Sequence, residues 1–346
     1  MQKNLLTILA GIFLLSLSLQ AATPLQKALP LLQKSNRTEA ENQQVLHLFR
    51  SSTDPDTIFA AGASLVKTPP TKGQEPALFN VLLHSNDGLK QTFTAVIITA
   101  MGSIHEELTP TLLQALSGKD TVLRSYAAGA YALINPADKT YTNDVVRLYA
   151  FDPSFSQRAL NALTENSAQL FKYVKQAAVA ANASTRAAAA AWLGNQHSPE
   201  AAKLLLKRAK KETDASVSTQ LATALAKNRE LTLQDTVDGL KQSYKTPQSA
   251  TYALALGFMT GNSVEYLRRG LTDKNTNIRI NAARATAYMA GVLANPDAFA
   301  YSQDRTFDIH LLKGLIAPLK ALAVSGSADE QLYAQNALQQ IEKLME

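Results

Sequence analysis

Small and apolar residues recur along this chain at helical spacing, and the pattern repeats about every 32 residues. Arg124, Arg186 and Arg279 are each followed, three and four positions later, by a pair of alanines. Six more positions align in the same anchor column: Thr57, Gln91, Arg158, Ser218, Ala250 and Gln331. Paired alanines favour helix and let a neighbouring helix approach closely. The pattern predicts nine similar units, each built around a helix with a small-residue face.

A second column, twelve positions before each anchor, is apolar in eight units and holds Asp238 in the seventh. Such a column is typical of the buried face of a preceding helix. The expected first helices of the units span residues 41–50, 76–84, 108–117, 142–150, 168–180, 199–211, 232–244, 262–271 and 309–324. No sustained alternation of apolar and polar residues indicates a strand.

A third column, four positions before each anchor, contains only residues that cap helices. Its members are Thr53, Asp87, Asp120, Ser154, Asn182, Asp214, Thr246, Asn275 and Ser327. Side chains of these four types accept hydrogen bonds from the free N–H groups of a first helical turn. Each unit is therefore predicted to be a helix, a short polar turn, an N-cap and a second helix.

The ends of the array differ from its interior. Residues 24–35 predict a capping helix, and residues 331–346 predict a terminal helix with a polar edge; both suit the exposed ends of an array. The last two anchors are 52 residues apart, which indicates an insertion at about 293–309. We expect an all-α fold, an α-solenoid formed as a superhelix of about nine antiparallel helix pairs. The cap occupies 22–40 and the repeats 41–346.

The motif Ile278-Arg279-x-x-Ala282-Ala283 resembles HEAT-like repeats, and their short-period type named after phycobilisome lyases most of all. Leu123-Arg124-x-x-Ala127-Ala128 and Thr185-Arg186-x-x-Ala189-Ala190 resemble it as well. The resemblance covers about 41–346, although five repeats lack the anchor arginine. It implies that Arg124, Arg158, Arg186 and Arg279 tie adjacent repeats together. It does not imply lyase activity, since repeat proteins of this kind mostly act as binding surfaces.

The first 21 residues have the features of a secretory signal peptide. Lys3 precedes an apolar run from Leu5 to Leu19, and Ala21 offers a small residue for cleavage. The run is short for a membrane-spanning helix, although an uncleaved N-terminal anchor is the alternative. The chain has no cysteine, which excludes disulfides, thiolate metal sites and a lipoprotein anchor. We expect a bacterial periplasmic or secreted protein without an integral membrane span after cleavage.

Catalytic motifs are missing from the sequence. The five histidines lie in different repeats or loops, and no zincin, phosphate-binding or EF-hand motif occurs. Ser64-x-x-Lys67 matches one mark of penicillin-recognising enzymes, but the accompanying Lys-Thr-Gly motif is absent. We therefore predict no catalytic, cofactor-binding or metal-binding residues, and a protein that is not an enzyme.

Candidate binding residues fall in two regions. Between Lys172 and Lys211 eight cationic residues face one acidic residue, Glu200, in a chain of formal net charge +6. The cluster suits an acidic partner, unless it is only a solvated face. Candidate partner-binding residues are Lys203, Lys207, Lys210, Lys211 and Trp192, with Phe299, Tyr301 and Phe307 in the insertion. Trp192 stands in an alanine column, where it either fills a gap or protrudes as an anchor.

These features favour an exported scaffold or adaptor that binds a protein or an anionic envelope component. Nucleic acid is not an expected partner of a chain that we expect to be exported. The alternatives are a structural component of a cell-envelope assembly, or an enzyme whose site has no sequence signature.

Overall fold

The computed structural model describes residues 24–70, 73–101, 104, 106–295 and 305–345. Throughout these residues the chain is helical, with short turns and no β-strand. They divide between two compact units, Met1–Ala115 and Leu116–Glu346. The predicted all-α class is confirmed. The expected signal peptide lies outside the described residues.

The first unit consists of helices that pack in pairs, and the pairs contact each other through their second helices. Its elements are α2 (Pro24–Gln33), α3 (Glu39–Ser51), α4 (Pro55–Lys67), α5 (Glu75–His84), α6 (Gly88–Ala100), η1 (Glu106–Leu108) and the start of α7 (Thr109–Ser117). Helix α3 packs on α4 and α5 on α6, while α4 and α6 contact each other. Phe93 of α6 lies against Gly62 of α4, where an added Cβ would come within 2.4 Å of the ring.

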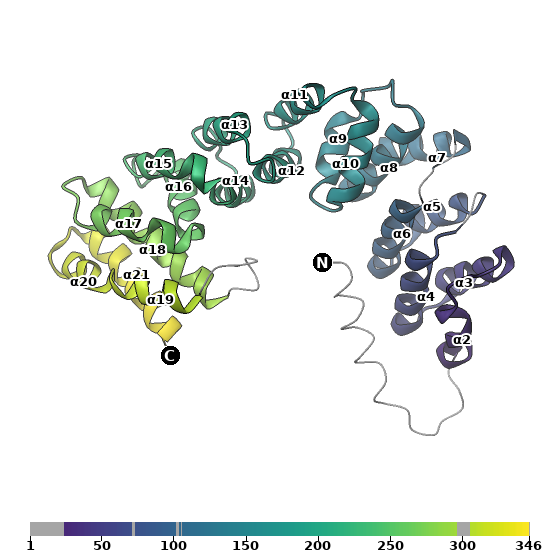
Figure 1. The fold of residues 1–346 in the computed structure, drawn as a ribbon, viewed down its shortest axis with the longest axis horizontal. Coiled ribbons are helices and arrows are strands. Elements are labelled where there is room, and N and C mark those ends of the chain that lie inside the picture. Colours follow the sequence, from purple (N-terminus) through teal and green to yellow (C-terminus); the bar gives the residue numbers. More distant parts are fainter. Residues whose placement is uncertain (1–23, 71–72, 102–103, 105, 296–304, 346) are drawn as a thin grey trace. The chain divides into compact units, whose positions relative to one another are not determined.

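The second unit follows the same alternation over most of its length. Its elements are α8 (Thr121–Ile134), α9 (Thr142–Leu148), α10 (Pro153–Leu163), α11 (Ser167–Ala177), α12 (Ala183–Gly194), α13 (Pro199–Ala209), α14 (Ala215–Lys227), α15 (Arg229–Gly239), α16 (Pro247–Phe258), η2 (Thr260–Ser263), α17 (Val264–Leu271), α18 (Thr276–Ala294), α19 (Arg305–Lys313), α20 (Ile316–Ser325) and α21 (Ala328–Met345). Helices α12, α14, α16, α18 and α21 each pack on the next, and α11, α13, α15, α17 and α20 form an adjoining layer (Figure 1).

Six of the nine predicted caps accept a hydrogen bond at the start of a helix. A side-chain oxygen accepts a bond from a first-turn N–H at Asp87, Asp120, Asn182, Asp214, Thr246 and Asn275. Thr53 and Ser154 were wrong predictions, because Asp54 and Asp152 cap those helices. In both cases a proline follows the true cap, and its fixed φ suits the first helical position. Ser327 directly precedes α21.

The alanine columns form close helix contacts. Ala128, Ala190, Ala222 and Ala283 are all at most 2% exposed. Small side chains on these faces let α12, α14, α16 and α18 lie close together. The predicted buried face of the second helices is thus confirmed at these positions.

Two predicted first helices were wrong in detail. The helix expected at 232–244 is α15, which begins earlier, at Arg229, and turns Asp238 outward to an ion pair with Lys241. Gly239 and Leu240 are buried beside it. The helix expected at 309–324 is instead two helices, α19 and α20. Helix α19 takes up the end of the predicted insertion and packs on α18 and η2.

The regular alternation is interrupted at α10. Helix α12 packs on α9, whereas α10 packs on α8 and α9. Trp192 of α12 lies at this interruption, is 3% exposed, and donates from Nε1 to Oε1 of Gln157 on α10 at 3.0 Å. The large ring therefore fills space that the helix backbones leave open, which explains a tryptophan in an alanine column.

Candidate functional site

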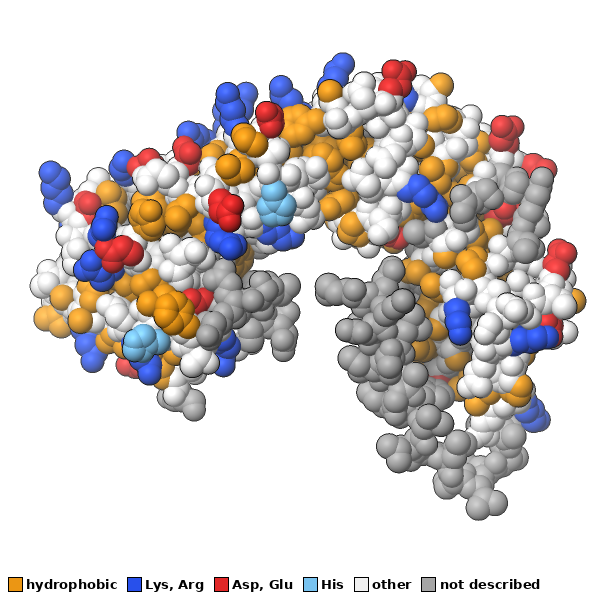
Figure 2. All heavy atoms as spheres, viewed as in Figure 1, with side chains coloured by type: hydrophobic (Ala, Val, Ile, Leu, Met, Phe, Trp, Pro, Cys, Tyr) orange, Lys and Arg blue, Asp and Glu red, His pale blue; other side chains and the backbone are white. Residues whose placement is uncertain are grey.

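A groove with a positively charged rim runs between α11 and α13. It has a volume of about 460 Å³ and is lined by Lys172, Lys175, Gln176, Val179, Leu204, Lys207, Arg208 and Lys211. We call it the basic groove. Figure 2 shows lysine and arginine side chains gathered along the edge of the second unit that carries α11 and α13. No acidic residue is among those lining the groove.

The sequence of α13 directs its lysines outward. Ser198 caps the helix by accepting from the N–H of Ala201, and Pro199 occupies the first helical position. Leu205 and Ala209 are fully buried, so Lys203 and Lys207 on the opposite face are exposed. Basic side chains in the last turn also interact favourably with the negative end of the helix dipole.

The floor of the basic groove is apolar. Val179, just after α11, is 61% exposed, and Leu204 of α13 is 8% exposed. Lysine side chains are suited to the edge of such an apolar floor, because the aliphatic stem packs along apolar surface while the ammonium stays in water. The groove therefore offers both an apolar contact and several cations to one ligand.

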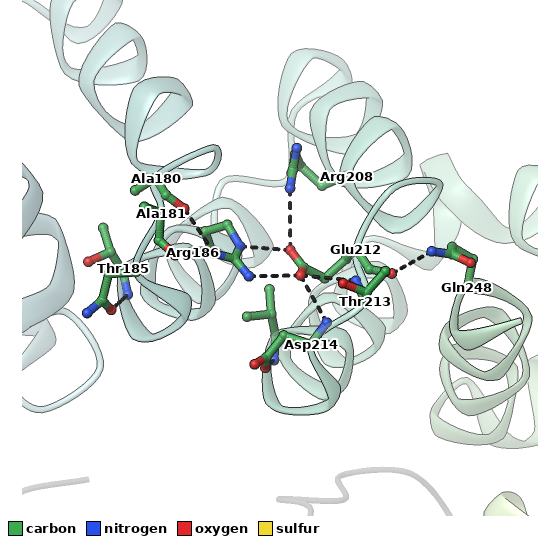
Figure 3. A network of polar contacts seen from close by, with 11 residues as sticks. Ala180, Ala181, Thr185, Arg186, Arg208, Glu212, Thr213, Asp214 and Gln248 are labelled. Atoms are coloured by element: carbon green, nitrogen blue, oxygen red, sulfur yellow. Dashed lines mark hydrogen bonds and ion pairs between the residues drawn. The ribbon is translucent and has the colours of Figure 1, made fainter.

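The inner wall of the groove is fixed by a buried carboxylate. Glu212, 3% exposed, accepts two hydrogen bonds of 2.9 Å from Arg186 of α12 and one of 3.3 Å from Arg208 of α13. Gln248 of α16 donates to the Glu212 carbonyl oxygen at 2.8 Å (Figure 3). The network joins three helices and the turn before α14.

Hydrogen bonding keeps Glu212 ionised despite its burial. Burial alone would raise the pKa of the carboxyl, but the bonds from Arg186 and from the backbone N–H groups of Asp214 and Thr213 outweigh it. Together they lower the pKa of Glu212 to about 2. Glu212 offsets one of the two arginine charges, so Arg208 and the four lysines together give the groove its positive charge.

Other anchor arginines make comparable contacts. Arg279 of α18 donates to Glu330 of α21 at 2.6 Å from Nε, and Arg124 of α8 reaches Asp144 of α9 at 3.2 Å. Arg158 instead lies 5.0 Å from the ring centre of Phe155, within the same helix. The structural role implied for the anchor arginines is seen between helices at Arg124, Arg186 and Arg279.

The candidate binding residues separate on the structure. Lys207 and Lys211 line the basic groove, whereas Lys203 and Lys210 are exposed but do not line it. Trp192 is buried, so its interpretation as a protruding anchor is wrong. Phe307 of α19 is 57% exposed, far in sequence from the groove. Phe299 and Tyr301 lie outside the described residues.

Sequence reasoning missed the apolar floor and the carboxylate. Val179 and Leu204 are 25 positions apart in the sequence, and only the fold brings them to one groove. Glu212 directly follows Lys211, the last lysine of the basic cluster. The sequence does contain a signal for this ion pair. An acidic residue directly follows the basic run and lies 26 positions after the anchor arginine Arg186.

The serine of the Ser64-x-x-Lys67 match has a structural role. Ser64 is 6% exposed and donates to the carbonyl oxygen of Leu32 at 2.6 Å. Its hydroxyl also accepts a bond from Arg37, which further contacts the carbonyl oxygens of Ser64 and Thr68. Lys67 is exposed. The group thus fastens the segment before α3 to α4.

Comparison with known proteins adds little. No protein-family model matches the chain. No curated protein matches it either. Among solved structures, it is similar to the crystal structure of an engineered protein from the Northeast Structural Genomics Consortium, at 19% identity over 88% of this chain and 97% of that one. The TM-score is 0.21.

Proposed function

We propose that this chain is an exported, non-enzymatic α-solenoid of the HEAT-like type that binds an acidic segment of a partner protein. The basic groove is the observation that carries the proposal. In it, Lys172, Lys175, Lys207 and Lys211 have no hydrogen bond or ion pair with any residue that the structure describes.

Charge complementarity favours an acidic partner. Four exposed ammonium groups around one groove repel one another, and a ligand with several carboxylates relieves that repulsion. The chain's own carboxylate at this place, Glu212, is occupied by arginines. The lysines are therefore available to a second molecule.

The apolar floor favours a peptide over a simple polyanion. Exposed Val179, with Leu204 beside it, offers burial to one or two apolar side chains of the partner. Burying such a side chain contributes about 1.5–3 kcal/mol, which adds to the salt-sensitive attraction of the rim. We expect the bound segment to combine acidic residues with a leucine or phenylalanine.

Repetition of helix pairs supports a binding role. A layer formed by successive helices presents an extended surface on which adjacent repeats contribute to one site. In the described part of the chain no helix has the length and apolar content needed to cross a bilayer. Export remains a proposal that rests on residues 1–21 of the sequence.

The direct test uses a fluorescently labelled peptide that contains both glutamate and leucine residues. Its binding is followed by fluorescence anisotropy at low and at high salt. Wild type should bind it saturably, and the affinity should fall as salt screens the rim. Replacing Lys172, Lys175, Lys207 and Lys211 together by Gln should weaken binding by about tenfold or more at low salt.

The matched control removes the same charge elsewhere. Replacing Lys203, Lys210, Lys274 and Lys320 by Gln changes the net charge equally but leaves the groove intact. It should retain most of the affinity. Equal loss in both variants, or no binding by wild type, would contradict the proposed groove. A polyglutamate peptide that binds as tightly as the leucine-containing one would remove the role of the apolar floor.

A further inference from the structure

A second site-like feature lies in the first unit, between α3, α5 and the start of α6. A pocket of about 410 Å³ is lined there by His47, Arg50, Ser51, Asn80, Val81, His84, Ser85 and Lys90. We call it the histidine pocket. Its residues come from two adjacent repeats, so two of the five histidines share one pocket although 37 positions separate them in the sequence.

The lining residues are mainly hydrogen-bond donors. Arg50 and Lys90 are cationic, His47 and His84 each supply at least one ring N–H, and Asn80 supplies an amide. No aspartate or glutamate lines the pocket. A set of this composition matches a ligand that offers several acceptor oxygens and negative charge.

Many of these donors are unused within the described chain. Arg50, His47, His84 and Asn80 make no side-chain hydrogen bond or ion pair with the residues that the structure describes. Lys90 donates to the carbonyl oxygen of Arg50 at 2.8 Å, which holds its ammonium beside the pocket. Two further protons of that ammonium remain for a ligand.

Helix ends account for part of this arrangement. Helices α3 and α5 both end at the pocket, and basic residues near helix C-termini interact favourably with the helix dipole. That effect explains Arg50 and His84 separately. The helix dipole does not explain why donors from three helices line one pocket. It also does not explain why no acidic residue is among the lining residues.

We propose that the histidine pocket binds a phosphate-bearing anion. The planar guanidinium of Arg50 suits two oxygens of one phosphate group, and Lys90 supplies a second charge from the first turn of α6. The volume exceeds that of a single phosphate, so there is room for a diphosphate or a small phosphate ester. This site is independent of the basic groove and of the function proposed for it.

Calorimetry with inorganic pyrophosphate tests the proposal on the full chain at low salt. The wild-type protein should bind one equivalent of pyrophosphate, with a dissociation constant below about 1 mM. Arg50→Gln with Lys90→Gln should weaken binding by about tenfold or more, and His47→Ala with His84→Ala by several-fold. Circular dichroism checks that each variant remains folded.

Lys27→Gln with Lys67→Gln is the matched control, since it removes two charges from the first unit outside the pocket. It should leave affinity unchanged. Vesicles containing phosphatidic acid form a second arm: sedimentation with them but no pyrophosphate binding assigns the phosphate group to a lipid headgroup. No binding of either probe, or equal weakening by control and pocket variants, would overturn the proposal.

Discussion

At the scale of single residues, burial and hydrogen bonding shift the pKa of Glu212 in opposite directions, and the effect of hydrogen bonding is the larger. The carboxylate receives bonds from two arginines and two backbone N–H groups while almost no part of it is exposed. Removing its charge would leave Arg186 and Arg208 partly buried without a carboxylate to balance them, although Arg186 would keep its bonds to the carbonyl oxygens of Ala180 and Ala181. The residue therefore matters more to the fold than any of the groove lysines around it.

Glu212→Gln should lower the free energy of unfolding by about 3 kcal/mol, measured by urea denaturation at pH 7. Because the folded pKa is about 2 and below the ordinary value of 4.5, this contribution is present above pH 4.5. It is lost as the pH falls from about 4.5 towards 2. Wild-type stability should decline in that range, and the variant should decline less.

Glu265 provides the comparison. Its pKa is also lowered to about 2, through hydrogen bonds from Arg268 and Arg269, but its side chain is 50% exposed. Exposed ion pairs contribute little to stability, so Glu265→Gln should change the unfolding curve only slightly. Similar losses in the two variants would show that the burial of Glu212 has no energetic consequence.

At the scale of helices, local signals were predictable and contacts between helices were not. Asp120 and Asn275 were identifiable as caps because capping depends on residues within one turn. The outward turn of Asp238 and the packing of α12 on α9 depend on neighbours distant in sequence. The same holds for the histidine pocket and the basic groove, each of which needs two repeats in contact.

A glycine in α4 allows a specific helix contact to be tested. Gly62→Ala would place a Cβ 2.4 Å from the Phe93 ring, so overpacking should destabilise the protein by about 1–3 kcal/mol. In Gly291→Ala, within α18, the new Cβ meets nothing within 4 Å, and stability should rise by about 0.5–1 kcal/mol. Chemical denaturation measures both. A gain in both variants would mean that α6 moves away from α4 without loss.

At the scale of the whole molecule, the sequence predicted repeated helix pairs, and the structure describes all-helical units of this kind. Each unit has its own buried residues, such as Phe49 and Ile58 in the first and Leu225 and Leu256 in the second. The interruption at α10 and the division of the last repeat into α19 and α20 were not predictable, since both depend on how distant side chains fill space.

Export is the remaining prediction at this scale. Protein released from the periplasm of a bacterial host by osmotic shock should begin at Ala22, as measured by intact mass. Ala21→Leu should block cleavage, because the position requires a small residue, and retain the longer mass. Recovery of the uncleaved chain in the cytosolic fraction would contradict the signal-peptide interpretation.

The indole of Trp192 is the chain's only tryptophan and lies where α10 and α12 are bridged by side chains. Excitation at the red edge of protein absorbance therefore selects one fluorophore at one joint. A buried indole emits at shorter wavelength than a hydrated one, so the emission maximum follows the opening of this joint alone. Far-ultraviolet circular dichroism averages over all helices. If the emission of Trp192 changes at a lower denaturant concentration than the dichroism, the contact between α10 and α12 opens before the helices unfold.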